Sequence, residues 1–181
     1  MNILIAISAG IAIVKIPELI TSLCKMNHQV KCLMTEHAAK FISPHLVFGP
    51  LTNNPVYTDM WAPPDTYDVE HVSLAKWADI VLLAPATANT IGKIVNSIAD
   101  NLLTTTIMAI PKETPIIVAP AMNNEMWNNH FFQKALKELE SLPNYTIIPP
   151  VKKRLACGDI AMGGMAEVSI ILEKIAEKST S

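Results

Sequence analysis

Few cysteines occur in this sequence, and their number is odd. Cys24, Cys32 and Cys157 are the only cysteines among 181 residues, and their spacing matches no disulfide framework. Disulfides form in oxidising compartments and are rare in the cytosol. The cysteine content therefore predicts a reducing, cytoplasmic environment and argues against a disulfide-stabilised scaffold.

An excess of charge of either sign is also missing. Fourteen Lys and Arg residues stand against sixteen Asp and Glu residues, for a formal net charge of −2. Nucleic-acid-binding proteins concentrate basic residues on one face, so we expect no nucleic-acid partner. Only 17% of the residues are charged and 50% are hydrophobic, which excludes an intrinsically disordered chain.

Long hydrophobic runs are absent as well. No run reaches the roughly 18 apolar residues that cross a bilayer. The apolar segment 1–14 lacks a basic N-terminal region and is interrupted by Ser8-Ala9-Gly10, which disfavours a secretory signal. We therefore expect a cytoplasmic protein without a membrane partner.

Short apolar segments alternate with helical patterns along the chain. Segments 80–84 and 116–119 are apolar at every position, as is typical of strands buried on both faces of a parallel sheet. The alternation predicts an α/β fold, a doubly wound parallel sheet with helices on both faces, formed as a single domain over residues 1–181. Strands are expected at 2–8, 29–34, 80–84, 116–119 and 145–148, and helices at 11–26, 36–42, 88–98, 101–108, 128–139 and 167–178.

Two long segments, 49–67 and 149–164, fit neither pattern. Long irregular segments within a compact domain are usually lids or binding loops. Doubly wound folds bind ligands beyond the carboxyl ends of their strands. The candidate ligand-binding positions are therefore at these ends: Ser8, Thr35, 85–90 and 120–123.

Two of these strand ends can bind polar ligand groups. Ser8-Ala9-Gly10 leads into a helix, where backbone N–H groups can bind a phosphate. It has one glycine where a dinucleotide fingerprint has three, so an ordinary tight turn explains it about as well. Segment 85–90 contains Thr87, Asn89 and Thr90. Helix capping explains one or two of these side chains but hardly all three, which favours a ligand loop.

Three further side chains are candidates for chemistry. The amide of Asn123, within the segment 120–127, can donate to a carboxylate, although Asn also begins helices. His71 can act as a base near neutral pH, although a capping or surface histidine is the commoner case. Cys157 follows a Lys-Lys-Arg run whose charge favours the thiolate, although a loop cysteine without a role is commoner. The other four histidines show no ligand spacing, so no metal site is expected.

Taken together, these segments resemble the homo-oligomeric flavin-containing cysteine decarboxylases over nearly the whole chain. Segment 85–90 matches the family's Pro-Ala-Ser-Ala-Asn-Thr motif, with Thr87 in place of Ser. His71 matches an active-site histidine. A PxMNxxMW motif and a substrate clamp are matched by Pro120, Met122, Asn123, Met126 and Trp127, and by Ala156, Cys157, Gly158 and Asp159.

The resemblance implies a flavodoxin-like or Rossmann-like fold and a homotrimer, or a multiple of trimers, with FMN near the subunit interface. The clamp loop covers residues 149–165. The implied FMN contacts are Ser8, Gly10, Thr35, Phe41, Pro85, Ala86, Thr87, Ala88, Asn89 and Thr90, and the implied substrate contacts are Met122, Asn123, Ala156, Gly158 and Asp159.

The clamp cysteine points to the branch that decarboxylates phosphopantothenoylcysteine to phosphopantetheine in coenzyme A biosynthesis. There the flavin oxidises the substrate thiol, which supplies the electron sink for loss of carbon dioxide. The resemblance implies that His71 takes part in the oxidation and decarboxylation and that Asn123 binds the substrate carboxylate. It also implies that Cys157 donates the proton when the enethiol is reduced.

The chain departs from the family in the clamp. Gly164 stands where the family commonly has Arg. Either Lys152, Lys153 or Arg154 replaces this charge, or the clamp binds its substrate differently. Three alternative functions stay open: a peptidyl-cysteine decarboxylase of peptide maturation, a flavoprotein that serves as a regulatory binding subunit, and a flavin prenyltransferase.

Overall fold

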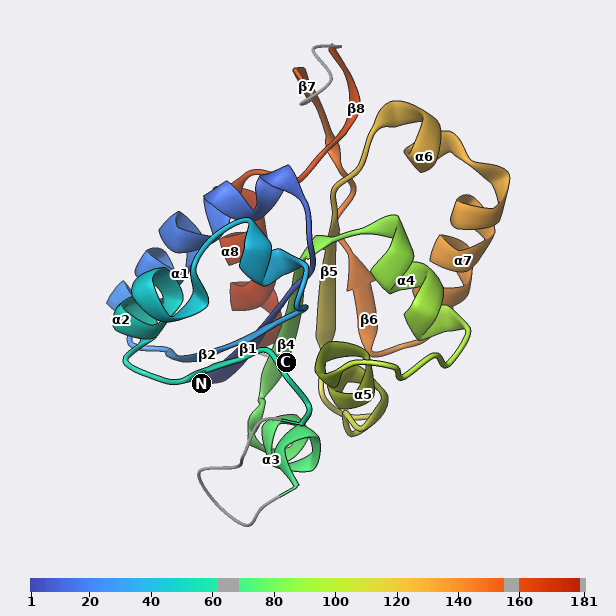
Figure 1. Ribbon diagram of the computed structural model, residues 1–181. Coiled ribbons are helices and arrows are strands. Elements are labelled where there is room, and N and C mark those ends of the chain that lie inside the picture. The colour runs from blue at the N-terminus through green and yellow to red at the C-terminus, as the bar shows by residue number, and fades with distance from the viewer. Residues whose placement is uncertain (62–68, 155–159, 180–181) are drawn as a thin grey trace.

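The structure is a computed structural model that describes residues 1–61, 69–154 and 160–179. Its centre is a sheet of six parallel strands in the order β3-β2-β1-β4-β5-β6 (Figure 1). This is the order of a Rossmann-like doubly wound fold, so the expected fold class is confirmed. The strands are β1 (Asn2–Ile7), β2 (Gln29–Met34), β3 (Val56–Tyr57), β4 (Ile80–Ala86), β5 (Ile116–Pro120) and β6 (Tyr145–Ile147).

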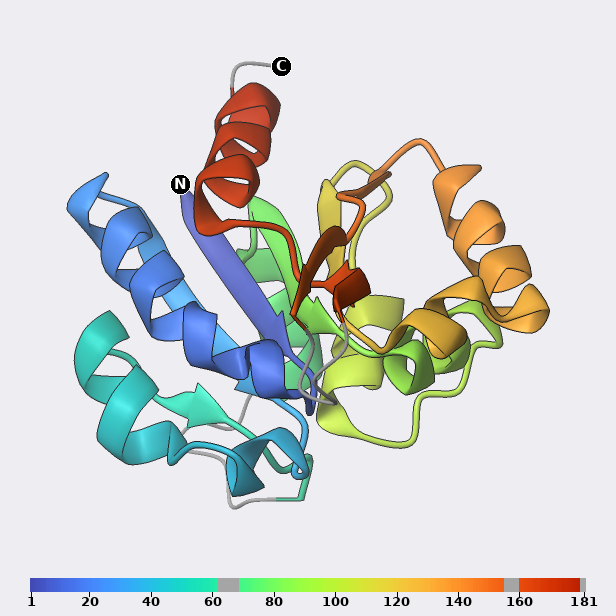
Figure 2. The same ribbon diagram turned by 90° about the horizontal axis from the view of Figure 1, so that it is seen from above.

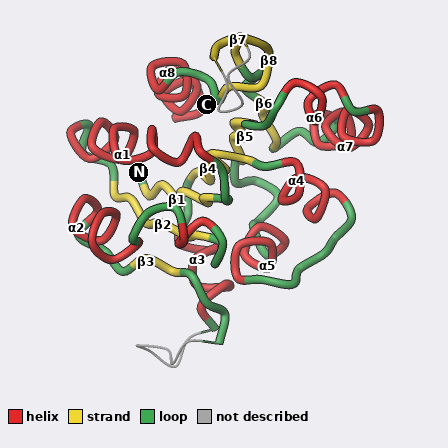
Figure 3. The backbone as a smooth tube through the Cα atoms, turned by 45° about the horizontal axis from the view of Figure 1, so that its top comes forward, coloured by secondary structure: helices red, strands yellow, loops and turns green. Residues whose placement is uncertain are grey.

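Helices cover both faces of this sheet (Figures 2 and 3). Side chains alternate along a strand, so Ile3 and Ile5 of β1 join one hydrophobic cluster while Leu4 joins the other. The first cluster includes residues of α1 (Ile16–Lys25) and α8 (Val168–Ser179). The second includes residues of α3 (Glu70–Trp77), α4 (Ala88–Val95), α5 (Leu102–Met108) and α7 (His130–Glu140).

Two of the expected helices differ from the prediction. The segment 11–26 forms a 3₁₀-helix, η1 (Ile11–Lys15), followed by α1, because Pro17 in the first turn of α1 has no N–H to donate. The helix expected at 128–139 is found as α7, whose first turn is capped by the Asn129 side chain, and a short helix, α6 (Asn124–Asn128), precedes it. The expected helix at 36–42 is reduced to a 3₁₀ turn, η2 (Ala38–Lys40).

The two segments without an expected element do contain regular structure. Segment 49–67 begins with α2 (Gly49–Thr52) and also contains β3. A π-helix, η3 (Pro44–Phe48), directly precedes α2. In the second, β7 (Val151–Arg154) and β8 (Ile160–Gly164) pair as an antiparallel hairpin. The hairpin lies over the carboxyl ends of the sheet strands (Figures 1 and 2). None of the helices in the described ranges is long and apolar enough to cross a bilayer.

Candidate active site

Two adjoining cavities lie at the carboxyl edge of the sheet, and they share Ala9, Thr87 and Met126. We call the first the hairpin cavity, of about 720 Å³, and the second the β2 cavity, of about 660 Å³. The hairpin cavity is lined by Ala9–Lys15 apart from Ile13, by Thr87, Ala88, Ala121, Met122, Asn123 and Met126, and by Lys153, Gly163, Gly164 and Met165. The β2 cavity is lined by Ala9, Thr35, Glu36, His37, Lys40, Phe41, Thr87, Asn89, Thr90, Lys93, Asp100, Asn101 and Met126.

Ser8 joins the ends of β1 and β4, where the strand order of the sheet reverses. Its hydroxyl donates to the Pro85 carbonyl oxygen (2.6 Å) and accepts from the Thr87 N–H (2.9 Å). The side chain is fully buried. Ser8 therefore fixes the loop that follows β4, and any contribution to ligand binding passes through that loop.

Capping accounts for two of the three polar side chains in the loop after β4. The Thr87 hydroxyl accepts from the Thr90 N–H (3.3 Å) and is hydrogen-bonded to the buried Thr90 hydroxyl (3.1 Å). Both contacts stabilise the first turn of α4. Asn89, in contrast, is exposed and lines the β2 cavity. Asn89 is the side chain of this loop that is best placed to meet a ligand.

Asn123 begins α6 and lines the hairpin cavity. Its Oδ1 accepts from the Met126 N–H (2.8 Å), which is the usual N-cap contact. This bond fixes the orientation of the amide and leaves the Nδ2 group as the donor for a ligand in the cavity. Asn123 is therefore both a helix cap and a candidate binding residue.

Gly163 attaches the hairpin to the loop that carries Asn123. The Met122 N–H donates to the Gly163 carbonyl oxygen (2.9 Å). Gly163 has φ +131°, and a Cβ at this position would overlap the Met122 carbonyl oxygen. Only glycine combines this conformation with such a close backbone contact.

Thr35 and Phe41, to which the resemblance assigns flavin contacts, line the β2 cavity. The Thr35 hydroxyl accepts from the Ala38 N–H (3.2 Å) and so shapes the turn after β2. Phe41 is 53% exposed although it is aromatic. An exposed aromatic ring beside hydroxyl and amide groups suits a planar ligand with polar edges, so these residues fit a flavin.

His71 lies at the opposite end of the sheet. It belongs to α3, which precedes β4 and lies near the amino end of that strand (Figure 1). The seven residues of β4 span about 20 Å at ~3.3 Å per residue. His71 is half-buried and is absent from the lining of both cavities, as far as the described residues go. One copy of the chain therefore does not bring His71 to Asn123.

The C-terminal end of α3 is firmly attached to the sheet. The Lys31 ammonium lies 4.6 Å from the centre of the Trp77 ring, and the Trp77 carbonyl oxygen accepts from Asn2 Nδ2 (3.1 Å). Burial lowers the pKa of Lys31. These contacts hold the helix that carries His71 in a defined position.

The predicted clamp residues Ala156, Cys157, Gly158 and Asp159 lie outside the described residues. The strands beside them are described, and they add Lys153, Gly163 and Gly164 to the hairpin cavity. Reasoning from the sequence missed Lys15 as a residue of the site, and it placed the two hairpin glycines in the clamp loop, 149–165, without assigning them a contact. The Gly163-Gly164 pair in a chain with six glycines was the available signal.

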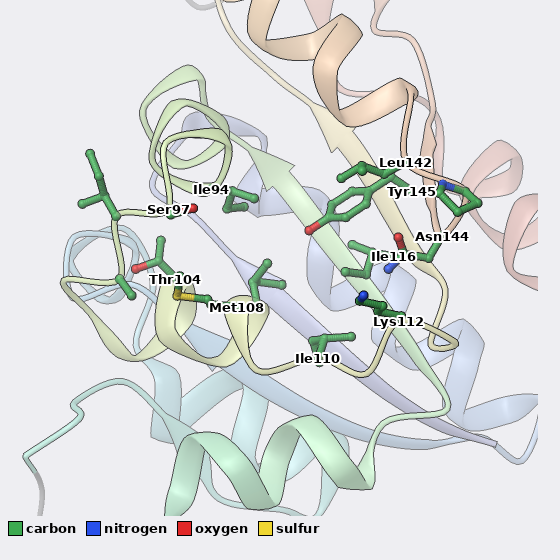
Figure 4. Close-up of a pocket in the computed structure, with 14 residues that line it drawn as sticks. Ile94, Ser97, Thr104, Met108, Ile110, Lys112, Ile116, Leu142, Asn144 and Tyr145 are labelled. Carbon is green, nitrogen blue, oxygen red and sulfur yellow. The ribbon is translucent and has the colours of Figure 1, made fainter.

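A third cavity, of about 450 Å³, lies at the amino ends of β5 and β6, away from the predicted site residues (Figure 4). Its walls are mainly apolar, and the Tyr145 side chain points into it. Burial raises the pKa of Tyr145. No residue predicted from the sequence belongs to its described lining.

Comparisons with known proteins identify relatives of the whole chain. A model of the family described as Flavoprotein matches residues 1–180. The probable phosphopantothenoylcysteine decarboxylase of Streptococcus mutans is 40% identical over 177 residues, which cover 98% of each chain.

Two solved structures share the fold over nearly their full length. A cysteine-to-serine mutant of phosphopantothenoylcysteine decarboxylase, complexed with pantothenoylaminoethenethiol, has a TM-score of 0.87 at 35% identity and covers 99% of this chain and 98% of its own. The FMN-binding protein AtHal3 has a TM-score of 0.80 at 36% identity and covers 97% of this chain and 94% of its own.

Proposed function

This chain belongs to the Flavoprotein family, and from that membership we propose that it decarboxylates phosphopantothenoylcysteine to phosphopantetheine, with FMN as its flavin. Asn123 is the observation that carries the proposal. Its cap bond uses Oδ1, which leaves the Nδ2 amide of a cavity-lining residue free to donate to a substrate carboxylate. Relatives that carry the name of this activity, at 36–40% identity, support the choice of substrate.

Loss of carbon dioxide from a saturated carbon needs an electron sink, because the remaining electron pair has no stable place. When bound, a flavin would supply it by taking two electrons from the CH₂–SH group of the substrate, which gives a C=S group whose sulfur can accept the electrons released with carbon dioxide, and by returning two electrons to the resulting enethiol. The β2 cavity, with Thr35, Phe41 and Asn89, would hold the flavin. No external oxidant is consumed over the cycle.

Three residues of the chain have different roles in the decarboxylation. Asn123 holds the substrate carboxylate until the C–C bond breaks, and His71 takes the proton released when the thiol is oxidised. Cys157 gives a proton to carbon when the enethiol is reduced. The similar solved structure, a cysteine-to-serine mutant with bound pantothenoylaminoethenethiol, supports this last assignment.

An oligomer is part of the proposal, because His71 and Asn123 are at opposite ends of the sheet. A homotrimer, or a multiple of trimers, would place His71 of one copy beside Asn123 of the next. Large apolar side chains are exposed in the segments that precede α3 and follow β2 in the chain: Trp61 and Val69, at 83% and 59%, and Phe41 and Leu46, at 53% and 80%. Burial of such side chains between copies would stabilise the assembly.

The function is tested with the purified holoprotein under anaerobic conditions. Phosphopantothenoylcysteine should yield equal amounts of carbon dioxide and phosphopantetheine, measured by mass spectrometry. A peptide ending in cysteine is the parallel substrate. Turnover of the peptide alone would favour the peptidyl-cysteine alternative, and a flavoprotein that turns over neither substrate would favour a regulatory binding subunit.

The shared site is tested by mixing two inactive variants, His71→Asn and Asn123→Asp, in equal amounts during coexpression. If each site takes its two residues from different copies, about a quarter of the sites in random mixed oligomers regain both native residues. Carbon dioxide release should therefore return to about that fraction of the wild-type rate. The double variant mixed with His71→Asn serves as a control that cannot regain activity. Absence of recovery in the first mixture would reject the shared site.

A further inference from the structure

The third cavity, at the amino ends of β5 and β6, has a mainly apolar wall and one charged residue in its described lining, Lys112. Lys112 is exposed and forms no ion pair with any described residue. Three large apolar side chains of the wall are strongly exposed: Ile98, Met108 and Leu142, at 46%, 61% and 43%. An apolar wall beside one unpaired cation suits a ligand with an apolar body and a single negative charge.

Tyr145 supplies a hydrogen-bond donor inside this cavity. Its side chain points into the cavity from β6, toward the side where Ile94 and Ser97 lie (Figure 4). No described residue shares a hydrogen bond with its hydroxyl. Burial raises the pKa of Tyr145, so the hydroxyl stays protonated and can donate. The Tyr145 ring and the Met108 thioether also favour an aromatic ligand, because both pack well against aromatic rings.

Ser97 adds a second hydroxyl to the cavity wall, at a position where glycine is usual. It follows α4 with φ +56°. The Ser97 N–H donates to the Ile94 carbonyl oxygen (3.1 Å), and the Ile98 N–H donates to the Lys93 carbonyl oxygen (2.9 Å). These two bonds close a helix on a left-handed residue, for which glycine is preferred because it has no Cβ. Serine gives up that preference and retains a hydroxyl at the cavity.

The segment 97–101 belongs to the walls of two cavities. Residues 97–99 line the third cavity, whereas Asp100 and Asn101 line the β2 cavity. Asp100 pairs with Lys93 of α4 (2.6 Å), which also lines the β2 cavity. A ligand in the third cavity therefore contacts the same short segment that holds this ion pair at the β2 cavity.

We propose that the third cavity binds a small aromatic monocarboxylic acid, and that the bound acid favours flavin binding in the β2 cavity by holding segment 97–101 in place. The carboxylate pairs with Lys112 and accepts from the Tyr145 hydroxyl, and the Ser97 hydroxyl offers it a third donor. The site itself stands on the third cavity alone, whereas its effect on flavin binding rests on the proposed function.

Binding is measured with phenylbutyrate and its neutral amide, phenylbutyramide, by saturation-transfer NMR on the holoprotein saturated with phosphopantetheine. The acid should bind about 5-fold more tightly than the amide, as expected for an exposed ion pair. Lys112→Met should remove this preference. Tyr145→Phe, which keeps the ring, should weaken binding of both compounds about 5-fold.

Lys137→Met is the matched control for Lys112→Met. Lys137 is exposed on α7 and is not among the described lining residues of any of the three cavities. This variant should bind both compounds as the wild type does.

The effect on flavin binding is measured as release of FMN from the diluted holoprotein, followed by flavin fluorescence. Saturating phenylbutyrate should lower the dissociation constant of FMN about 5-fold, which is a typical coupling between two sites. Because such coupling is reciprocal, FMN should tighten the binding of phenylbutyrate by the same factor.

Four results would overturn the proposal. Displacement of phenylbutyrate by FMN or phosphopantetheine would place the acid in the other two cavities. Equal affinity of the wild-type protein for acid and amide would reject the ligand class. A lower oligomer mass of Lys112→Met in light scattering would assign the cavity to a contact between copies. An unchanged dissociation constant of FMN with bound acid would reject the coupling. Binding of the acid by a flavoprotein that releases no carbon dioxide would reject the decarboxylase function and leave the site standing.

Discussion

Asn123→Asp is expected to abolish carbon dioxide release and to leave the fold intact. Aspartate caps a helix as well as asparagine does, so the bond to the Met126 N–H and the start of α6 should survive. The Nδ2 donor, however, is replaced by a negatively charged oxygen that repels the substrate carboxylate. Loss of a hydrogen bond to a charged group costs ~1.5–3 kcal/mol, and repulsion adds to it, so the rate should fall at least about 100-fold.

The measurement is single-turnover release of carbon dioxide, together with thermal unfolding. The unfolding free energy should stay within about 1 kcal/mol of the wild-type value, because the cap is retained. Asn124→Asp is the matched control: it makes the same change one residue away, and Asn124 is not among the described lining residues of either cavity. An equal loss of activity in both variants would attribute the effect to general charge and reject the assignment of Asn123.

Cys157→Ser separates the two halves of the same reaction. It should release carbon dioxide in the first turnover and stop at the unreduced enethiol, because the proton for carbon is missing. Asn123→Asp should release none. The two variants are distinguished by mass spectrometry of the quenched mixture, and equal loss of carbon dioxide in both would refute the division of parts between Asn123 and Cys157.

Both roles of Asn123 could be predicted from the sequence, but not that one side chain performs both. The two readings of this residue, a helix start and an amide donor, are compatible, because its oxygen makes the cap bond and its nitrogen is left for a ligand. A sequence pattern treats them as alternatives. Ser8 is the opposite case: its place at a strand end was predicted, but its hydroxyl is used by Pro85 and Thr87, nearly eighty residues away. These two hydrogen bonds of the Ser8 hydroxyl depend on the pairing of β1 with β4, which the sequence does not show.

The strands that could be predicted are those whose own residues are apolar enough to indicate burial. The segment expected as a strand at 29–34 coincides with β2, and fully apolar β4 and β5 were also identified. β7 was missed because three of its four residues are Lys or Arg, and its partner β8 lies beyond the clamp residues. β3 has only two residues and is fixed by β2. The position of His71 followed from neither pattern nor motif, since it depends on which end of the sheet α3 occupies.

Gly163→Ala is expected to detach the hairpin from the rest of the site. The added Cβ would overlap the Met122 carbonyl oxygen, and φ +131° is strained for any residue with a side chain. The strain costs ~1–3 kcal/mol if the backbone holds. Relief requires β8 to move away from Met122, which breaks the bond between the Met122 N–H and the Gly163 carbonyl oxygen. The hairpin wall of the cavity would move away from Asn123, so that phosphopantetheine binding should weaken.

Hydrogen exchange reports this detachment directly, because the Met122 amide should lose its protection while amides of β1 and β4 keep theirs. Gly92→Ala is the control: Gly92 lies within α4, and a Cβ there meets nothing within 4 Å. That change should stabilise the protein by about 0.5–1 kcal/mol, since alanine favours the helix. Unchanged protection of Met122 and unchanged phosphopantetheine affinity in Gly163→Ala would show that the contact between Gly163 and Met122 does not hold the site together.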